Sequence, residues 1–233
     1  MSKKVAILQS NYIPWKGYFD LMNMVDVFIF HDDLQYTKSD WRNRNLIKTP
    51  NGPKWLTIPC GTNEHRLICD VELKDSSWQL SHWASIKTNY AHSEYFKNYQ
   101  SFFEEIYLGT QWRNLSEMNQ AIIIRIARDL LGISTEFEDS RKYFLTQRKA
   151  ERVKELLIKA DATEYISGPA AKDYLSEEFL AEAGIQLTWM DYNNYPEYPQ
   201  LHPPFTHQVS IIDLLFNTGE RAVNFMKSFS KAG

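Results

Sequence analysis

The sequence predicts an α/β protein with a mostly parallel sheet of βαβ units, an inserted helical subregion and a small hairpin extension. Short apolar, β-prone runs alternate with helical patterns in the first and last thirds of the chain, as in βαβ units. Between them, over about residues 77–132, the pattern is helical only. Asn51 and Gly52 stand between two β-prone stretches, which is a strong hairpin signal. We expect one α/β domain over residues 1–233, with the helical insertion inside it.

The first βαβ unit is predicted over residues 4–32. KVAILQ, residues 4–9, is a short strand pattern, and DVFIFHD, residues 26–32, is a second one. Between them, Pro14 fits the first turn of a helix, and Trp15, Phe19 and Met22 recur at spacings of four and three. The motifs NYIPW and HDD therefore follow the carboxyl ends of two parallel strands. In open α/β sheets this edge is where ligands bind.

The remaining elements follow in order along the chain. Residues 37–60 contain the hairpin, and residues 68–74 a further short strand. Helices are expected over 76–90, 93–108 and 115–132, the last ended by Gly132. Strands over 133–139, 163–168 and 185–192 then alternate with helices over 146–160 and 176–184. A loop rich in Pro and Tyr, 193–208, leads to a terminal helix over 209–228.

The composition excludes several classes of protein. The 233 residues include 43% hydrophobic ones, which is ample for a core, and 26 basic against 29 acidic side chains leave a formal net charge of -3. No bulk field thus favours nucleic acid or an anionic membrane, so any phosphate binding must be local. No apolar run is long enough to span a membrane and the N-terminus lacks a cleavage site, so a cytoplasmic protein is expected. Two cysteines fit neither a disulfide framework nor a zinc pattern.

Aromatic side chains are abundant, at 14% of the chain with 7 Trp and 13 Tyr. Tyr and Trp combine a flat apolar face with a polar edge, which suits sugar rings and nucleobases as well as protein cores. Composition alone does not separate these uses.

Candidate acid–base residues follow the second strand. His31, Asp32 and Asp33 stand where α/β enzymes carry general bases, metal ligands or ribose-binding carboxylates. The alternative is that one carboxylate caps the next turn while the other is solvated. Because successive residues of a strand point to opposite faces, the two aspartates cannot both face one site unless the strand has already ended.

Two further segments could bind phosphate. Arg42 and Arg44 share a face of an extended segment and could clamp a diphosphate or carboxylate, with Lys48 joining them; ordinary salt bridges are the alternative. In ISGPAAKDYL, the turn after a strand at Gly168 offers backbone N–H groups, with Lys172 nearby. A helix cap without a ligand is the alternative, and the glycine spacing is not that of a phosphate loop.

The histidines give a weaker pattern. His207, Ser210 and Asp213 invite comparison with a catalytic triad, but no nucleophile elbow is present and Ser-x-x-Asp is an ordinary capping arrangement. His207 is retained as a candidate catalytic residue. The remaining histidines show no metal-ligand spacing, so no metal is expected.

Four long motifs resemble the successive signatures of the WbqC-like protein family: QSNYIPWKGYFDLM, VFIFHDDLQYTKSDWRNRNLI with GPKWLTIP, YISGPAAKDYL, and PPFTHQVSIIDLLFNTG. Their order is that of the family and they span nearly the whole chain. One departure is Gln9-Ser10, where the family usually has Gln-Pro. The matching positions are Gln9, Asn11, Tyr12, Pro14, Trp15, Gly17, Tyr18, Asp32, Asp33, Gln35, Tyr36, Trp41, Arg44, Asn45, Gly168, Tyr174, Ser210, Asp213 and Gly219.

The resemblance implies a role in O-antigen or other polysaccharide biosynthesis, as a transferase of glycine to the amino group of a nucleotide-linked dideoxyamino sugar. Such a substrate needs an aromatic face, cations for its diphosphate and a base for its amine. Together with the residues above, the expected substrate contacts are Gln9, Asn11, Tyr12, Trp15, Tyr18, Gln35, Tyr36, Trp41, Arg42, Arg44, Asn45, Lys48, Gly168, Lys172 and Tyr174.

The activated acyl donor stays open between an aminoacyl-adenylate, a charged tRNA and a thioester, and no cofactor is identified. Two alternatives to the transferase remain. One is a non-catalytic protein of the same pathway that binds a sugar nucleotide or another protein. The other is an ATP-dependent activating enzyme with a nucleotidyltransferase-like fold, although PWKGY lacks the His-x-Gly-His signature of those enzymes.

Overall fold

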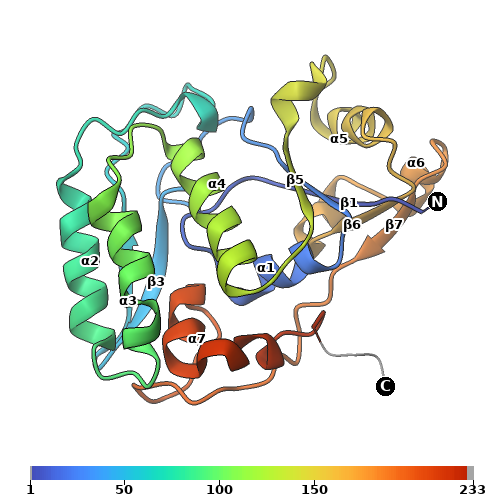
Figure 1. Ribbon diagram of the computed structural model, residues 1–233. Coiled ribbons are helices and arrows are strands. Elements are labelled where there is room, and N and C mark those ends of the chain that lie inside the picture. Colours follow the sequence, from blue (N-terminus) through green and yellow to red (C-terminus); the bar gives the residue numbers. More distant parts are fainter. Residues whose placement is uncertain (1, 230–233) are drawn as a thin grey trace.

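A five-stranded parallel sheet forms the centre of the chain. The computed structural model describes residues 2–229, and its sheet has the order β5-β2-β1-β6-β7 (Figure 1). Every neighbouring pair in it is parallel. The predicted parallel sheet of βαβ units is thereby confirmed. The strands are β1 (Lys4–Leu8), β2 (Val27–Phe30), β5 (Glu136–Asp139), β6 (Glu164–Ser167) and β7 (Gln186–Trp189).

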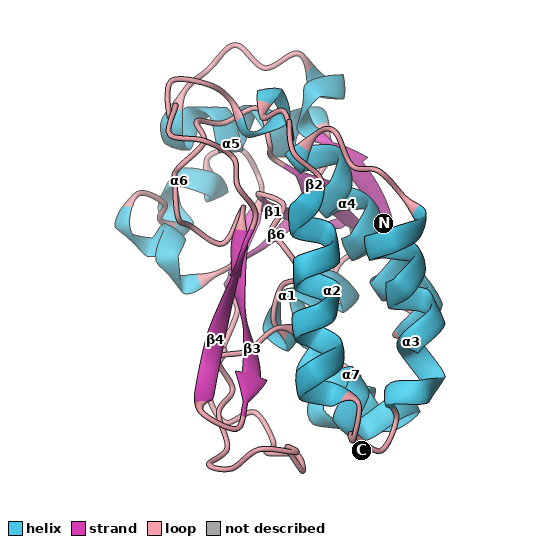
Figure 2. Cartoon of the chain, turned by 90° about the vertical axis from the view of Figure 1, so that its left-hand side faces the viewer, coloured by secondary structure: helices cyan, strands magenta, loops and turns pink. Residues whose placement is uncertain are grey.

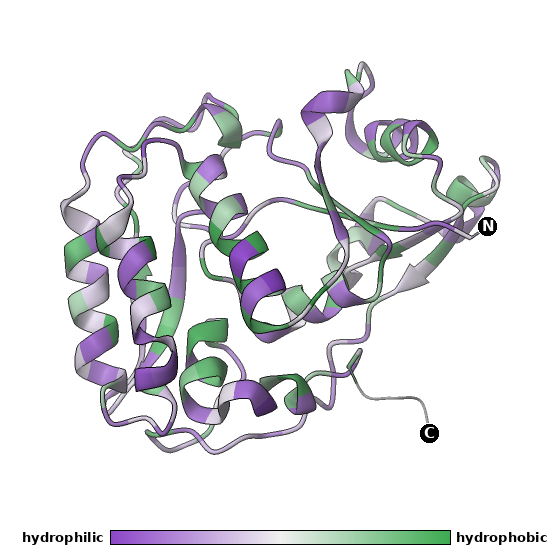
Figure 3. Ribbon diagram, viewed as in Figure 1, coloured by the Kyte–Doolittle hydropathy of each residue, from purple (hydrophilic) through white to green (hydrophobic). Residues whose placement is uncertain are grey.

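Helices cover both faces of this sheet. Alternate residues of β1 point to opposite sides, so Ala6 joins one core with α1 (Lys16–Asn23), α4 (Leu115–Arg125) and α7 (Ile211–Thr218). Val5 and Ile7 join a smaller core with α5 (Lys149–Lys159) and α6 (Glu177–Ala181). The apolar strands between these helices are visible in Figure 3. Burying each such side chain contributes about 1.5–3 kcal/mol, so both cores hold the sheet in place.

The hairpin forms where the sequence predicts it. β3 (Arg44–Thr49) pairs antiparallel with β4 (Gly52–Thr57), and Gly52 has φ +97° in the turn, a conformation that favours glycine. Figure 2 shows this ribbon standing beside α2 (Ser77–Tyr90).

The helical insertion is also confirmed. α2 is followed by α3 (Phe96–Glu104), which continues as a π-helical turn to Gly109, and by α4, which continues in the same way to Leu130 before Gly132. The Asn114 side chain caps α4 by accepting the N–H of Glu117 at 3.0 Å. Figure 1 places α2 and α3 on the opposite side of the molecule from α5 and α6.

Two predicted elements are wrong in detail. Residues 68–74 form no strand but a 3₁₀ turn, Ile68–Asp70, followed by an isolated bridge of Glu72 to Asn114. Their partner is the short linker that enters α4, which is too brief to build a ladder. The terminal helix over 209–228 is broken: α7 ends at Gly219, whose φ is +61°, and a 3₁₀ helix follows to Phe225. Within residues 2–229, no helix is both long and apolar enough to cross a membrane.

Candidate functional site

The strand order creates a switch point between β1 and β6. From β1 the chain continues through α1 to β2 on one side, whereas from β6 it continues through α6 to β7 on the other. Ligands of open α/β sheets bind outside the carboxyl ends of the strands at such a point. A cavity of about 280 Å³ lies there, which we call the crevice. It is lined by Gln9 after β1, His31 after β2, Ser167 and Gly168 at the end of β6, and by Arg42 and Tyr174.

His31 and Asp33 are held at the crevice by an arginine of α5. Arg152 donates through Nε to His31 Nε2 at 3.1 Å and through Nη2 to Asp33 Oδ2, while Ser140 Oγ donates to Asp33 Oδ1 at 2.5 Å. Burial lowers the pKa of His31 to about 4, with Asp33 opposing the shift and Arg152 adding to it. The imidazole is therefore neutral at pH 7. Since its Nε2 accepts a hydrogen bond, its proton lies on Nδ1.

Asp32 occupies the other side of the strand end, as the alternation of a strand requires. It has no exposed surface. Its Oδ1 accepts the N–H of Ser10 at 2.7 Å, and its Oδ2 accepts from Ser116 Oγ at 2.5 Å and Gln120 Nε2 at 3.0 Å. Asp32 thus joins the end of β1 to α4. This geometry supports a structural role for Asp32 and not that of a general base.

Arg42 connects the crevice to a second cavity. Its guanidinium donates to Gln9 Oε1 and, at 3.2 Å, to Asn11 Oδ1, and it lies 3.5 Å from Asp40 Oδ2. Gln9 lines the crevice, whereas Asn11 lines the neighbouring pocket. Arg42 is therefore the charged group at the boundary between the two.

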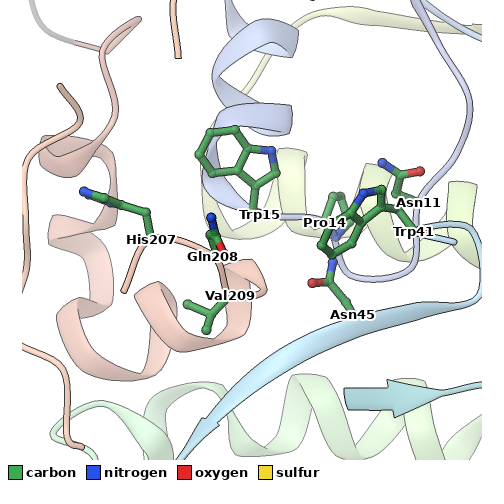
Figure 4. Close-up of a pocket in the computed structure, with 8 residues that line it drawn as sticks. All are labelled: Asn11, Pro14, Trp15, Trp41, Asn45, His207, Gln208 and Val209. Atoms are coloured by element: carbon green, nitrogen blue, oxygen red, sulfur yellow. The ribbon is translucent and has the colours of Figure 1, made fainter. Parts of the chain in front are cut away.

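The second cavity, which we call the central pocket, has a volume of about 420 Å³. Figure 4 shows Asn11, Trp41 and Asn45 on one side of it and the segment from His207 to Val209 on the other. None of its lining side chains carries a formal charge at pH 7, since burial lowers the pKa of His207 below its ordinary value. Aromatic walls with neutral amides suit an uncharged polar ring. The lining residues are Asn11, Pro14, Trp15, Trp41, Asn45, His207, Gln208 and Val209.

The loop before α1 has a strained backbone and is held by hydrogen bonds to Asn45 of the hairpin and to Trp41 just before it. Ile13 has φ +37°, which is rare for a β-branched residue. The Asn45 amide donates to the carbonyls of Tyr12 and Ile13, each at 3.0 Å, and the Tyr12 N–H donates to Trp41 O at 2.9 Å. These bonds fix the conformation that presents Asn11 and Trp15 to the central pocket.

The loop over residues 193–208 closes the other side of the central pocket and is fastened by two buried lysines. Lys16 Nζ donates to Pro196 O at 2.9 Å, and Lys48 Nζ donates to Pro204 O. Burial lowers the pKa of Lys16 to about 8. Lys48 is thus a structural residue, and Arg44 lies on the outer side of the hairpin. The structure does not bring Arg42, Arg44 and Lys48 together as one phosphate clamp.

Several aromatic candidates belong to the core. Tyr12 is fully buried, and its hydroxyl contacts His82 Nδ1 at 2.8 Å and Tyr107 Oη at 2.6 Å. Tyr36 is fully buried as well, and Tyr18 donates to the Gln9 carbonyl at 2.9 Å. All three side chains are buried and present no face to a ligand.

The other sequence-predicted residues lie around these cavities. Gly168 and Tyr174 line the crevice, as expected for a turn after β6. Lys172 lies instead over the ring of Trp189, 5.3 Å from its centroid. Gln35 forms a backbone bridge to Leu67 and lines a separate shallow surface.

Sequence reasoning missed Arg152, Ser140 and Gln208. Arg152 and Ser140 lie outside the four motifs, whereas Gln208 lies within the last one but was not singled out. Only the order of the elements could have indicated Arg152. A helix that connects two parallel strands begins at the carboxyl edge of the sheet, and Arg152 lies in the first turn of α5. Among residues 2–229, no three His, Cys, Asp or Glu side chains are grouped to hold a metal ion.

Comparison with known proteins gives two matches. The sequence model of the WbqC-like protein family matches residues 9–225. The uncharacterized protein Rv1507c of Mycobacterium tuberculosis is 44% identical over 227 residues, which cover 97% of this chain and 98% of that protein. The family match includes every residue that lines the central pocket, and all those that line the crevice except Ile7 and Leu8.

Proposed function

The chain belongs to the WbqC-like protein family, and from that premise we propose that it transfers an aminoacyl group, glycine, to the amino group of a nucleotide-linked dideoxyamino sugar in O-antigen or related polysaccharide biosynthesis. One observation carries the proposal. A crevice at the switch point of the sheet adjoins an uncharged, aromatic-walled pocket, and Arg42 lies between them. A sugar nucleotide has the same order of parts: a base and ribose, a charged diphosphate and a neutral ring.

The nucleoside is assigned to the crevice. Its position outside the ends of β1 and β6 is the usual nucleotide position in open α/β sheets. Gly168 leaves the backbone there without a side chain, and Tyr174, 54% exposed, offers an aromatic face for a base. Arg42 then meets the diphosphate, because a guanidinium has five donors and only some of them are used by Gln9 and Asn11.

The sugar ring is assigned to the central pocket. Its volume of about 420 Å³ is in the range of small-molecule sites. Trp15 and Trp41 provide faces for the apolar side of a pyranose, and the amide nitrogen of Asn11 can donate to its hydroxyls.

The transfer needs one proton acceptor. The amine nitrogen attacks the acyl carbonyl carbon, a C–N bond forms, the bond from that carbon to the donor's oxygen or sulfur breaks, and the electron pair leaves with the donor. The nitrogen then loses one proton. His207 lines the central pocket, and burial lowers its pKa, so we assign this proton to His207.

The test is mass spectrometry of a reaction that contains the protein, a dTDP-linked 4-amino-4,6-dideoxy sugar, glycine and ATP, and of a second reaction with glycyl-tRNA as donor. A glycyl mass increment with either donor supports the transferase. We expect His207→Gln to lose product formation while binding of the sugar nucleotide is kept, and Arg42→Gln to weaken that binding. Arg128→Gln, an arginine stacked on Phe137 away from both cavities, is the matched control.

A second candidate is an ATP-dependent activating enzyme. In chain order the five sheet strands read 3-2-1-4-5, an order also found in dinucleotide-binding sheets. Product from glycine and ATP without tRNA would favour it. Binding of the sugar nucleotide without any acyl increment, under both conditions, would reject both enzymes and favour a non-catalytic binding protein.

A further inference from the structure

Two tryptophans lie side by side on the outer surface of the hairpin region. Trp41 is 44% exposed and Trp55 is 40% exposed, and their ring centroids are 5.4 Å apart with an interplanar angle of 44°. Packing of the core does not explain why both indole side chains are exposed to solvent. Exposed aromatic faces of this size mark binding surfaces.

Arg44 adds an unpaired cation to this surface. Its guanidinium lies 4.1 Å from the centroid of the Trp55 ring. Over the described range 2–229 it makes no hydrogen bond or ion pair, and its Nε is buried without a partner. Arg42 and Arg152, by contrast, each contact a carboxylate. A partly buried guanidinium with no counter-ion, stacked on an indole, is suited to an anion attached to a flat ring.

This aromatic–arginine surface is continuous with the central pocket. A hollow of about 310 Å³ lies over Trp41, Arg44 and Trp55. Trp41 and Gln208 line both this hollow and the central pocket. A ligand on the outer surface can therefore reach the central pocket past Trp41.

We propose that the surface of Trp41, Trp55 and Arg44 binds the adenosine phosphate of the acyl donor. The inference rests on the proposed function, because forming an amide requires an activated acyl group. An aminoacyl-adenylate, the 3′ end of an aminoacyl-tRNA and a coenzyme A thioester all carry adenosine with phosphate. The adenine stacks on the indoles, the phosphate pairs with Arg44, and the acyl group extends into the central pocket. A neutral sugar on this surface would leave Arg44 without a counter-ion.

The experiment measures binding of AMP and of dTDP separately, by calorimetry, to the wild-type chain and to three variants. Arg44→Gln and Trp55→Ala remove the cation and one ring, and Arg42→Gln alters the crevice. We expect Arg44→Gln and Trp55→Ala each to weaken AMP binding roughly tenfold, as loss of one stacking or phosphate contact does, with dTDP binding unchanged. Arg42→Gln should show the reverse pattern. Arg128→Gln should change neither, and thermal unfolding verifies that every variant is folded.

Three further ligands distinguish the sources of adenosine. A CCA trinucleotide stands for the tRNA end, coenzyme A for a thioester, and AMP for the adenylate; the tightest ligand whose binding depends on Arg44 identifies the donor class. The inference is overturned if none of the three binds below about 10 mM, or if Arg44→Gln and Trp55→Ala leave their affinities unchanged. Preferential binding of a neutral methyl glycoside at Trp55 would also overturn it. If AMP binding depends on Arg44 but no glycyl transfer is detected, the proposed function is rejected, whereas the adenosine phosphate site at Arg44 is still supported.

Discussion

Ser10 stands where the resemblance to the WbqC-like motif predicts a proline, and its backbone N–H makes a hydrogen bond that proline cannot make. This N–H donates to Asp32 Oδ1 at 2.7 Å, and both residues are fully buried. Ser10→Pro should lower the free energy of unfolding by about 1–3 kcal/mol, because a buried carboxylate oxygen loses a donor. Ser10→Ala keeps the N–H and removes a hydroxyl that has no hydrogen-bond partner among residues 2–229, so it should change stability little. Urea unfolding at pH 7 compares the two variants.

An equal stability of the proline and alanine variants would show that the amide bond to Asp32 contributes nothing. Ser116 and Gln120 would then suffice to hold the carboxylate.

His31 and His82 predict a loss of stability in acid. Burial is the largest cause of the lowered pKa in both cases, to about 4. In the unfolded chain the ordinary pKa is about 6.5, so between these values the unfolded state binds more protons and stability rises with pH. The free energy of unfolding therefore has its full value above about pH 6.5 and decreases as the pH falls toward 4. From pH 7 to pH 5 each histidine should cost about 2 kcal/mol.

Urea unfolding at pH 7 and pH 5 measures this effect. His31→Gln removes one titrating group and should therefore show a smaller decrease between the two pH values than the wild-type chain. An identical decrease in the variant and the wild type would mean that His31 is not held neutral by its burial.

Helix α1 contains a glycine that makes room for a pocket residue. A Cβ on Gly17 would lie 2.3 Å from the Trp15 ring, too close for the indole to stay in place. In Gly17→Ala, the higher helix propensity of alanine should stabilise α1 by up to about 1 kcal/mol. The new methyl group should at the same time displace Trp15 from the central pocket. We expect a changed tryptophan fluorescence spectrum and at least tenfold weaker binding of the sugar nucleotide, with the fold retained.

Gly109→Ala is the matched control, since its Cβ would meet only the flexible Glu105 side chain, at 3.3 Å. Unchanged fluorescence and binding in Gly17→Ala would show that Trp15 does not depend on the space beside α1.

At the scale of helices and strands, the sequence predicts those features that interactions between neighbouring residues determine. The Asn-Gly turn and the alternation of strands and helices are encoded in neighbouring residues, and both are confirmed. Residues 68–74 are β-prone, yet among residues 2–229 they form only one isolated bridge, from Glu72 to Asn114, and the terminal helix ends at Gly219, where φ is +61°. Likewise, Tyr12 and Trp15 stand in one motif, but only tertiary packing sends Tyr12 into the core and Trp15 to the central pocket.

On the scale of the whole molecule, the candidate site joins segments that are far apart in the chain. The central pocket needs residues near 11, near 41 and near 207, and the crevice needs β1, β6 and α5. The motifs placed many of these residues at the correct sheet edge. They could not show that Arg42 lies between two cavities or that Arg152 engages both His31 and Asp33, since these contacts arise only when the sheet is assembled.

Asp20 connects α1 to the C-terminal part of the chain. It has no exposed surface, and it accepts hydrogen bonds from Tyr195 Oη at 2.5 Å, from the Lys227 N–H at 3.0 Å and from the Ser228 N–H at 2.7 Å. Asp20→Ala leaves these donors unpaired, so the segments around 195 and 227 should open more often. Because the loop over 193–208 also carries His207, the central pocket should lose its closed wall.

Hydrogen exchange read by mass spectrometry should therefore be faster over 193–208 and near 227 in Asp20→Ala, with β1 and β2 still protected, and the sugar nucleotide should bind more weakly. Asp26→Ala is the control, because within the described part of the chain Asp26 Oδ2 accepts only the exposed Lys4 N–H, at 2.7 Å. Faster exchange with unchanged affinity would mean that the sugar nucleotide does not need the loop over 193–208 to stay closed. Slow exchange in both variants would mean that the buried carboxylate does not hold the C-terminal segment to α1.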